Sequence, residues 1–172
     1  MNRAGFEALA DGVILLTILL VASTVSLSLA GERSSAPSDG AARYAEDTRV
    51  ALFRTTLDGL AFSQDGEAVV LPNDTSVEAF LRLQVHLEGR GAGGLDFHAA
   101  NSRIAGLANA LVRPGWSYAI VGRIAAGAPL LRLPSGSVLP EEYAVSNWSY
   151  PALDASVADT VLSLFVWLSP HR

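Results

Sequence analysis

The chain contains no cysteine and no lysine, and these two absences exclude several classes of function. Without cysteine there are no disulfides, no thiolate metal ligands and no thiol nucleophile. The twelve basic residues are all arginine, they are scattered along the chain, and the net charge is −5. We therefore expect no nucleic-acid partner, because a phosphate backbone is bound by clustered positive charge.

Patterns typical of catalytic and metal sites are also missing. The histidines His86, His98 and His171 include no pair at the i, i+4 spacing of a helical metal site. The glycine-rich segment 89–94 lacks the Gly-Lys-Ser/Thr ending of a phosphate loop, which favours a flexible connector. Residues 135–137, Ser-Gly-Ser, are typical of a turn between strands. We predict no catalytic residues, no metal, no cofactor and no small-molecule substrate.

What the chain does have is an uncharged stretch over residues 12–31. As a helix, about twenty residues span roughly 30 Å, which is the thickness of a bilayer's hydrocarbon core. We expect an N-terminal transmembrane anchor over residues 1–31, a linker over 32–40, and one domain over 41–172. A secretory signal peptide cleaved after the small-x-small sequence at 28–30 is the alternative, and a buried soluble helix is a third interpretation.

Charges and glycosylation sequons bear on the orientation of the domain. Arginines lie on both sides of the hydrophobic stretch, with more of them after it, which by itself favours a cytoplasmic domain. Long domains, however, cross a membrane largely regardless of charge. Asn73 and Asn147 begin Asn-x-Ser/Thr sequons, which are used only outside the cytoplasm. We expect an extracytoplasmic domain, candidate glycosylation at Asn73 and Asn147, and the membrane and other protein subunits as partners.

The residues before the uncharged stretch include Arg3-Ala4-Gly5-Phe6, which lead directly into the hydrophobic helix. This arrangement resembles the head of type IV pilin-like proteins, particularly the single-span archaeal kind. In that family a peptidase cuts after a glycine that follows a basic residue, so the resemblance implies processing between Gly5 and Phe6. Pilins carry a glutamate five residues after the cut, where this chain has Ala10.

Three amphipathic helices are expected in the domain. The first, over residues 43–60, has a regularly spaced apolar face with Arg49 outside it. The second, over residues 76–88, begins with a T-x-x-E capping box that starts at Thr75. The third covers residues 97–111. The apolar positions that define these faces are Val50, Phe53, Leu57, Leu60, Val77, Phe80, Leu81, Leu87, Phe97, Ile104, Leu107, Ala108 and Leu111.

The strands are predicted from turns and from apolar residues at every second position. Asp65-Gly66 suits the positive φ angles of a type I′ turn and predicts a hairpin. In the C-terminal half, a run of alternating residues and three short apolar runs predict a meander-like, mostly antiparallel sheet. These runs lie at 116–124, 130–133, 142–148 and 157–168. The last is apolar on both faces, so we expect a central strand with Trp167 largely buried against the helices or a neighbouring strand.

These features predict an α+β domain with about three helices, carried on an N-terminal transmembrane helix. We expect a membrane-anchored structural or protein-binding subunit of the pilin-like kind. A secreted binding module released by signal cleavage is the alternative, and an enzyme is third because no set of converging polar groups is visible. Trp116, Trp148 and Trp167 are interpreted as core residues of strands, with a carbohydrate-stacking surface as the alternative.

Overall fold

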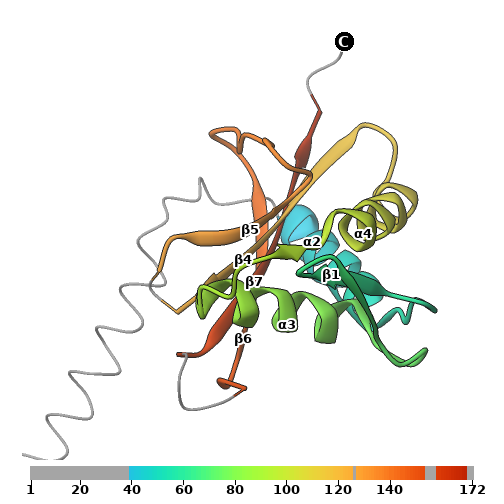
Figure 1. Ribbon diagram of the computed structural model, residues 1–172. Coiled ribbons are helices and arrows are strands. Elements are labelled where there is room, and N and C mark those ends of the chain that lie inside the picture. Colours follow the sequence, from blue (N-terminus) through green and yellow to red (C-terminus); the bar gives the residue numbers. More distant parts are fainter. Residues whose placement is uncertain (1–38, 126, 154–157, 170–172) are drawn as a thin grey trace, which may run out of the picture. The chain divides into compact units, whose positions relative to one another are not determined.

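The computed structural model describes residues 39–125, 127–153 and 158–169. The predicted anchor and most of the predicted linker lie outside these residues. Within them the chain is α+β with three helices and an antiparallel C-terminal sheet, as predicted, and it has a second, three-stranded antiparallel sheet (Figure 1). In this part of the chain no helix is long and apolar enough to cross a bilayer.

The described elements alternate between helices and short strands. The helices are α2 (Asp39–Arg54), α3 (Val77–Gly89) and α4 (His98–Leu111). The strands are β1 (Ala61–Gln64), β2 (Glu67–Val70), β3 (Leu95–Asp96), β4 (Trp116–Ile124), β5 (Pro129–Leu133), β6 (Ala144–Tyr150) and β7 (Thr160–Leu168).

The larger sheet has the strand order β5-β4-β7-β6, and all its neighbours are antiparallel. The predicted meander is therefore wrong, because β7 lies between β4 and β6 instead of at the end of the sheet. The prediction that the last strand is central is confirmed. An apolar strand is best placed where both of its edges are paired and both faces are covered.

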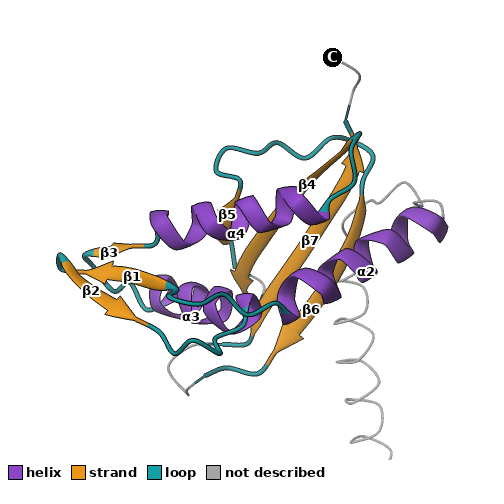
Figure 2. Ribbon diagram, turned by 90° about the vertical axis from the view of Figure 1, so that its right-hand side faces the viewer, coloured by secondary structure: helices purple, strands orange, loops and turns teal. Residues whose placement is uncertain are grey.

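The main core lies between this sheet and the helices. Helices α2 and α3 pack on the sheet, and α4 packs on α2 and on β1 (Figure 2). Gly122 of β4 faces Val85 of α3, where a Cβ atom would collide with the valine side chain, so glycine permits the close approach of helix and sheet. The largest fully buried side chains of this core include Leu52, Phe53, Phe80, Leu81, Ile104, Ile120, Leu162 and Leu164.

The opposite face of the sheet has a smaller apolar cluster. Phe165 of β7 is buried there beside two residues of β4, and the Tyr143 ring packs on it with centroids 5.1 Å apart. Trp167 belongs to this cluster but is only partly buried. The prediction that Trp167 is largely buried holds in part: most of its surface is covered, but the period of two places it with Phe165 on the face away from the main core and the helices.

The smaller sheet confirms the predicted hairpin. Asp65 and Gly66 both have positive φ, 52° and 86°, and the register joins Gln64 to Glu67 across a two-residue turn. The Asp65 N–H donates to the Gly94 carbonyl at 2.9 Å, and β3 then pairs with β1. The glycine-rich segment is thus tied to the hairpin at its end, which differs from the flexible connector that the sequence predicted.

Two helix predictions need correction. Helix α2 ends at Arg54 instead of residue 60, because Thr56 forms an isolated bridge with Ser76 and draws the chain away from the helix. The N-cap of α3 is Ser76, whose Oγ accepts the Ala79 N–H at 3.1 Å, so the predicted capping box starts one residue too early. Both differences arise at the bridge between Thr56 and Ser76, which joins the segment after α2 to the start of α3.

Candidate functional site

The most distinctive surface of the domain is the outer side of β6, which we call the β6 edge. Among the described residues β6 pairs only with β7, so one row of its backbone N–H and C=O groups has no strand beside it. Its seven residues, Ala-Val-Ser-Asn-Trp-Ser-Tyr, carry no charge and no proline. Asn147, Trp148 and Ser149 are exposed, and the Trp148 side chain keeps 49% of its surface accessible.

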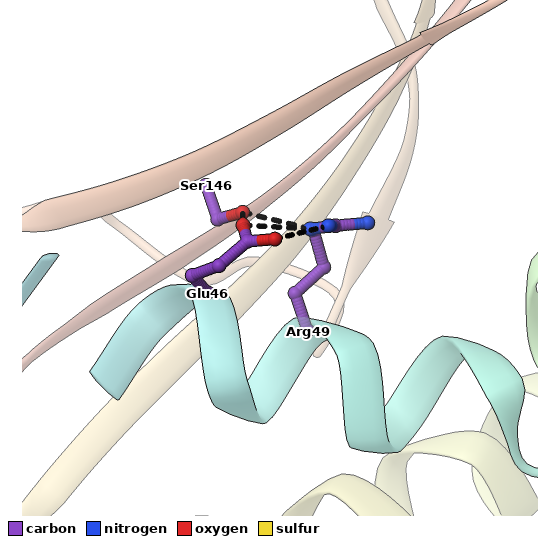
Figure 3. A network of polar contacts seen from close by, with 3 residues as sticks. All are labelled: Glu46, Arg49 and Ser146. Carbon is purple, nitrogen blue, oxygen red and sulfur yellow. Dashed lines mark hydrogen bonds and ion pairs between the residues drawn. The ribbon is translucent and has the colours of Figure 1, made fainter. Parts of the chain in front are cut away.

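A polar network holds β6 against α2, as Figure 3 shows. The Arg49 side chain is almost completely buried, with only 5% of the residue exposed. Its Nε donates to Ser146 Oγ at 2.8 Å and to Glu46 Oε2 at 3.2 Å, and its NH2 group pairs with Glu46 Oε1 at 2.5 Å. The Ser146 hydroxyl also donates to Glu46. All three side chains are thereby fixed relative to one another.

The electrostatics of this network favour a charged Glu46. Hydrogen bonds from Arg49 and Ser146 hold the pKa of the Glu46 carboxyl below its ordinary value of 4.5. The carboxylate in turn compensates the buried guanidinium, which would otherwise be a costly isolated charge. The Arg49 guanidinium also lies 4.7 Å from the centre of the Trp148 ring, a cation–π distance. One side of the exposed indole is therefore supported from within the domain.

A second arginine makes an equivalent contact from α3. The Arg82 guanidinium lies 4.6 Å from the centre of the Tyr150 ring, and its NH1 group is 3.9 Å from the Glu78 carboxylate. Burial, reinforced by the negative charge of Glu78, raises the pKa of Tyr150, so its hydroxyl stays neutral. Each of the two helices thus contributes one arginine that stacks on an aromatic ring of β6, and the strand is held in place without charge of its own.

The other edge strand of the sheet, β5, is built differently. It begins with Pro129, which has no N–H to donate, and it carries the positive charge of Arg132. Its register with β4 passes from Leu131 to Pro129, so Leu130 interrupts the ladder as a bulge. Short length, proline, charge and a bulge are the features by which natural sheets protect an edge from pairing. Only β6 combines an outer edge with none of these features in this sheet.

Two grooves of the domain are large enough to hold a small molecule. The larger, about 560 Å³, lies beside β5 and α4, and the ionisable side chains that line it are His98 and Arg132. It has no carboxylate for acid–base chemistry, and the Arg132 NH1 group already donates to the Ser137 carbonyl at 2.7 Å. The smaller, about 440 Å³, is lined by Trp116 and Trp167. Two tryptophans therefore share a groove, while the third lies on the β6 edge.

The histidines and the small turn lie apart from this surface. His86 is buried in α3, His98 is exposed at the start of α4, and His171 lies outside the described residues. No group of three or more His, Asp or Glu side chains in the described ranges could hold a metal ion. Residues 135–137 form a turn after β5, with the Ser137 N–H donating to the Pro134 carbonyl. The prediction of a turn there is confirmed.

The candidate modification sites are partly within the described residues. Asn73 is exposed in a turn after β2, and Asn147 is exposed at the centre of β6. Gly5 and Phe6 lie outside the described residues.

Sequence reasoning missed Arg49, which it placed outside the apolar face of its helix. The buried face of α2 is instead Ala45, Thr48, Arg49, Leu52 and Phe53, and its i, i+3, i+4 spacing is the signal that could have included the arginine.

No protein-family model matches this sequence, and neither the search of curated proteins nor that of solved structures found a similar protein.

Proposed function

We propose that the chain is a pilin-like, single-span membrane-anchored subunit that displays its domain outside the membrane and binds other proteins through the β6 edge. The anchor is supported by the uncharged residues 12–31, and the pilin-like character by the sequence around Gly5. A secreted binding module released by cleavage near residue 30 is the second candidate, favoured by the small-x-small sequence there. The intact mass of the mature chain separates the two.

The observation that carries the binding proposal is the contrast between the two edge strands. A row of unpaired backbone groups is satisfied best by the backbone of another extended segment, which is how proteins bind peptides by strand addition. The uncharged sequence of β6 favours an uncharged, strand-forming segment as the partner. The network of Glu46, Arg49 and Ser146 keeps the strand in its bound form before binding, which lowers the entropic cost of association.

A binding role is also favoured over catalysis by what lies around this edge. The charged side chains of the two arginines near β6 are engaged within the domain: Arg49 with Glu46 and Ser146, and Arg82 with Glu78. The neutral hydroxyl of Tyr150 and the ionised Glu46 do not form a poised acid–base pair, because the pKa of one is raised and that of the other is lowered away from neutrality. These side chains support a surface; they are not arranged for proton transfer.

The proposal is tested by photo-cross-linking the full-length chain in its native membranes. A photoreactive side chain replaces Val145 or Ser149 on β6 in separate variants, with Leu130 on β5 as the matched exposed control. We expect both β6 positions to link to one protein segment, at sites about four residues apart as strand pairing requires. Cross-links of equal yield from β5, or none from β6, would remove the basis of the proposal.

A further inference from the structure

We infer that the β6 edge pairs with the β6 edge of a second copy of this chain, antiparallel about a two-fold axis at Asn147. The inference rests on the proposed function, in which this edge receives a protein strand, and it names that strand. Pairing would join the two four-stranded sheets into one continuous sheet. The two interfaces would be identical patches, as in other two-fold dimers.

The register of such a pair is restricted by geometry. A two-fold axis perpendicular to the sheet keeps each residue on its own face, so only residues of the same face can lie opposite each other. The register that engages all seven residues of β6 has Asn147 opposite Asn147 of the second copy. Ser146 then lies opposite Trp148 of the second copy, Ala144 opposite Tyr150 and Val145 opposite Ser149. Other allowed registers leave residues at the strand ends unpaired.

Side-chain size agrees with this register. On the face toward the helices, the large rings of Trp148 and Tyr150 each lie opposite a small side chain, Ser146 or Ala144, of the second copy. A register shifted by one allowed step in one direction would place the two Trp148 rings opposite each other, and the same shift in the other direction would leave Tyr150 opposite residue 142, outside the strand. No residue of the strand is charged, so a strand of this sequence meets its own copy without the like-charge repulsion that destabilises directly opposite residues.

The exposure of Trp148 also supports a second copy of the chain as the partner of this edge. Arg49 stacks on its ring at 4.7 Å, yet 49% of the residue stays exposed at the edge of the sheet. A second copy would cover this surface at the position where its own Ser146 lies. Helix α2 packs on β7 as well as on β6, so it does not lie over the edge strand alone.

Self-pairing is disfavoured at β5 by the same criteria. A two-fold pair of β5 strands would bring the charge of Arg132 close to its own copy, and Pro129 could not donate to the ladder. In the proposed membrane-anchored form all copies share one membrane, which raises their effective concentration and favours association through a short strand interface. The second copy is therefore the partner that this edge fits best.

The absence of cysteine permits a direct test by disulfide formation in the full-length chain. In the inferred register the Cα atoms of residue 147 in the two copies lie about 4.5–5.5 Å apart, within disulfide reach. Asn147→Cys should therefore give a covalent dimer on mild oxidation. Ser149→Cys, equally exposed on the same face, lies about 13 Å along the strand from its equivalent and should not cross-link. Leu130→Cys on β5 serves as the control for random collision.

A mixture of two variants provides an independent check of the register. Val145→Cys and Ser149→Cys chains should form a disulfide with each other and not with themselves, because only the mixed pair lies opposite across the axis. Equal cross-linking of Asn147→Cys, Ser149→Cys and Leu130→Cys would show collision without a defined interface and would overturn the inference.

The outcome also separates this inference from the proposed function. If residue 147 forms no disulfide while the photoreactive β6 variants link to a different protein, then pairing with a second copy is wrong and the binding role of the edge stands. If β6 links to no protein in either experiment, both are wrong. A disulfide at residue 147 with the mixed-pair result supports both.

Discussion

The two edge strands of the larger sheet differ in every feature that controls strand pairing. β5 has five residues, with a proline, an arginine and a bulge, whereas β6 has seven uncharged residues in regular register with β7. Both strands belong to one sheet and face the same solvent, so the difference does not arise from the fold itself. It supports the proposal that the chain associates through β6, with β5 protected against association.

The support beneath the two edges differs as well. Arg132 on β5 donates to a carbonyl of the following turn, Ser137, and stays within its own segment. Arg49 connects α2 to β6 across 97 positions of the sequence and is buried. In the proposed function β6 pairs with another protein, and a network that reaches across the fold would give the strand the fixed conformation that such pairing needs.

The largest expected effect concerns this support. Arg49→Ala should destabilise the domain by about 2–4 kcal/mol, because it leaves a cavity and removes a buried charge that bonds to Ser146. Arg132→Ala should cost about 1 kcal/mol or less, since Arg132 is only half-buried. Urea unfolding of the full-length chain in detergent measures both. Equal losses would mean that the two edges are held alike, contrary to this account.

The second prediction gives β6 the protection of β5. Ser149→Lys adds a positive charge to the exposed edge, two residues from its centre at Asn147, and should weaken self-association about tenfold or more, with stability changed by less than about 0.5 kcal/mol. Val138→Lys, at an exposed position outside the sheet, is the matched control and should change neither quantity. Sedimentation of the detergent-solubilised chain reports association. Unchanged association of the Ser149→Lys variant would argue against β6 as the interface.

A third prediction compares two exposed apolar side chains on the two edges. Trp148→Ala should lower the free energy of unfolding by about 1 kcal/mol through loss of the Arg49 contact. It should lower the free energy of association by more than this amount. Leu130→Ala on β5, 38% exposed, should leave association unchanged. If both substitutions weaken association equally, Trp148 has no special part in the interface. Thermal melting and sedimentation on the same samples separate the two effects.

The smallest effect is a dependence on pH. The pKa of Glu46 is lowered in the folded chain relative to its ordinary value of 4.5. The contribution of ionised Glu46 to the stability of the fold is therefore complete above pH 4.5, and it is lost as the pH falls from there through the pKa of the folded state. Because the carboxylate is half-exposed, solvent screening reduces the contribution to a few tenths of a kcal/mol. Glu46→Gln should flatten the loss of stability in acid, with exposed Asp47→Asn as control. Parallel acid unfolding curves for wild type and Glu46→Gln would contradict the network.

How far the sequence predicted the fold depended on how local the cause was. The Asp65-Gly66 hairpin was found because two adjacent residues determine a type I′ turn. The central position of the last strand was found because its apolar residues occupy both faces. Each conclusion needed only the segment itself.

The sequence-based predictions were wrong where the structure of a segment depends on residues far away in the sequence. Arg49 was placed away from the buried face because an arginine without a known partner is expected to be exposed to solvent. Its burial depends on the hydrogen bond to Ser146, which is distant in the sequence. The strand order could not be predicted, because it depends on the pairing of β4 with β7, two strands that β5 and β6 separate in the sequence. The β6 edge follows from that order, so no local pattern could identify it before the sheet was known.

Hydrogen exchange at the two edges tests the central claim most directly. The full-length chain is compared by mass spectrometry when dilute and when concentrated in detergent, with peptides covering β5 and β6. We predict that exchange within residues 144–150 slows on concentration, because the outward N–H groups of β6 enter a ladder, while exchange within 129–133 stays the same. Equal slowing at both strands, or none at β6, would contradict the claim that β6 is the edge kept open for another strand.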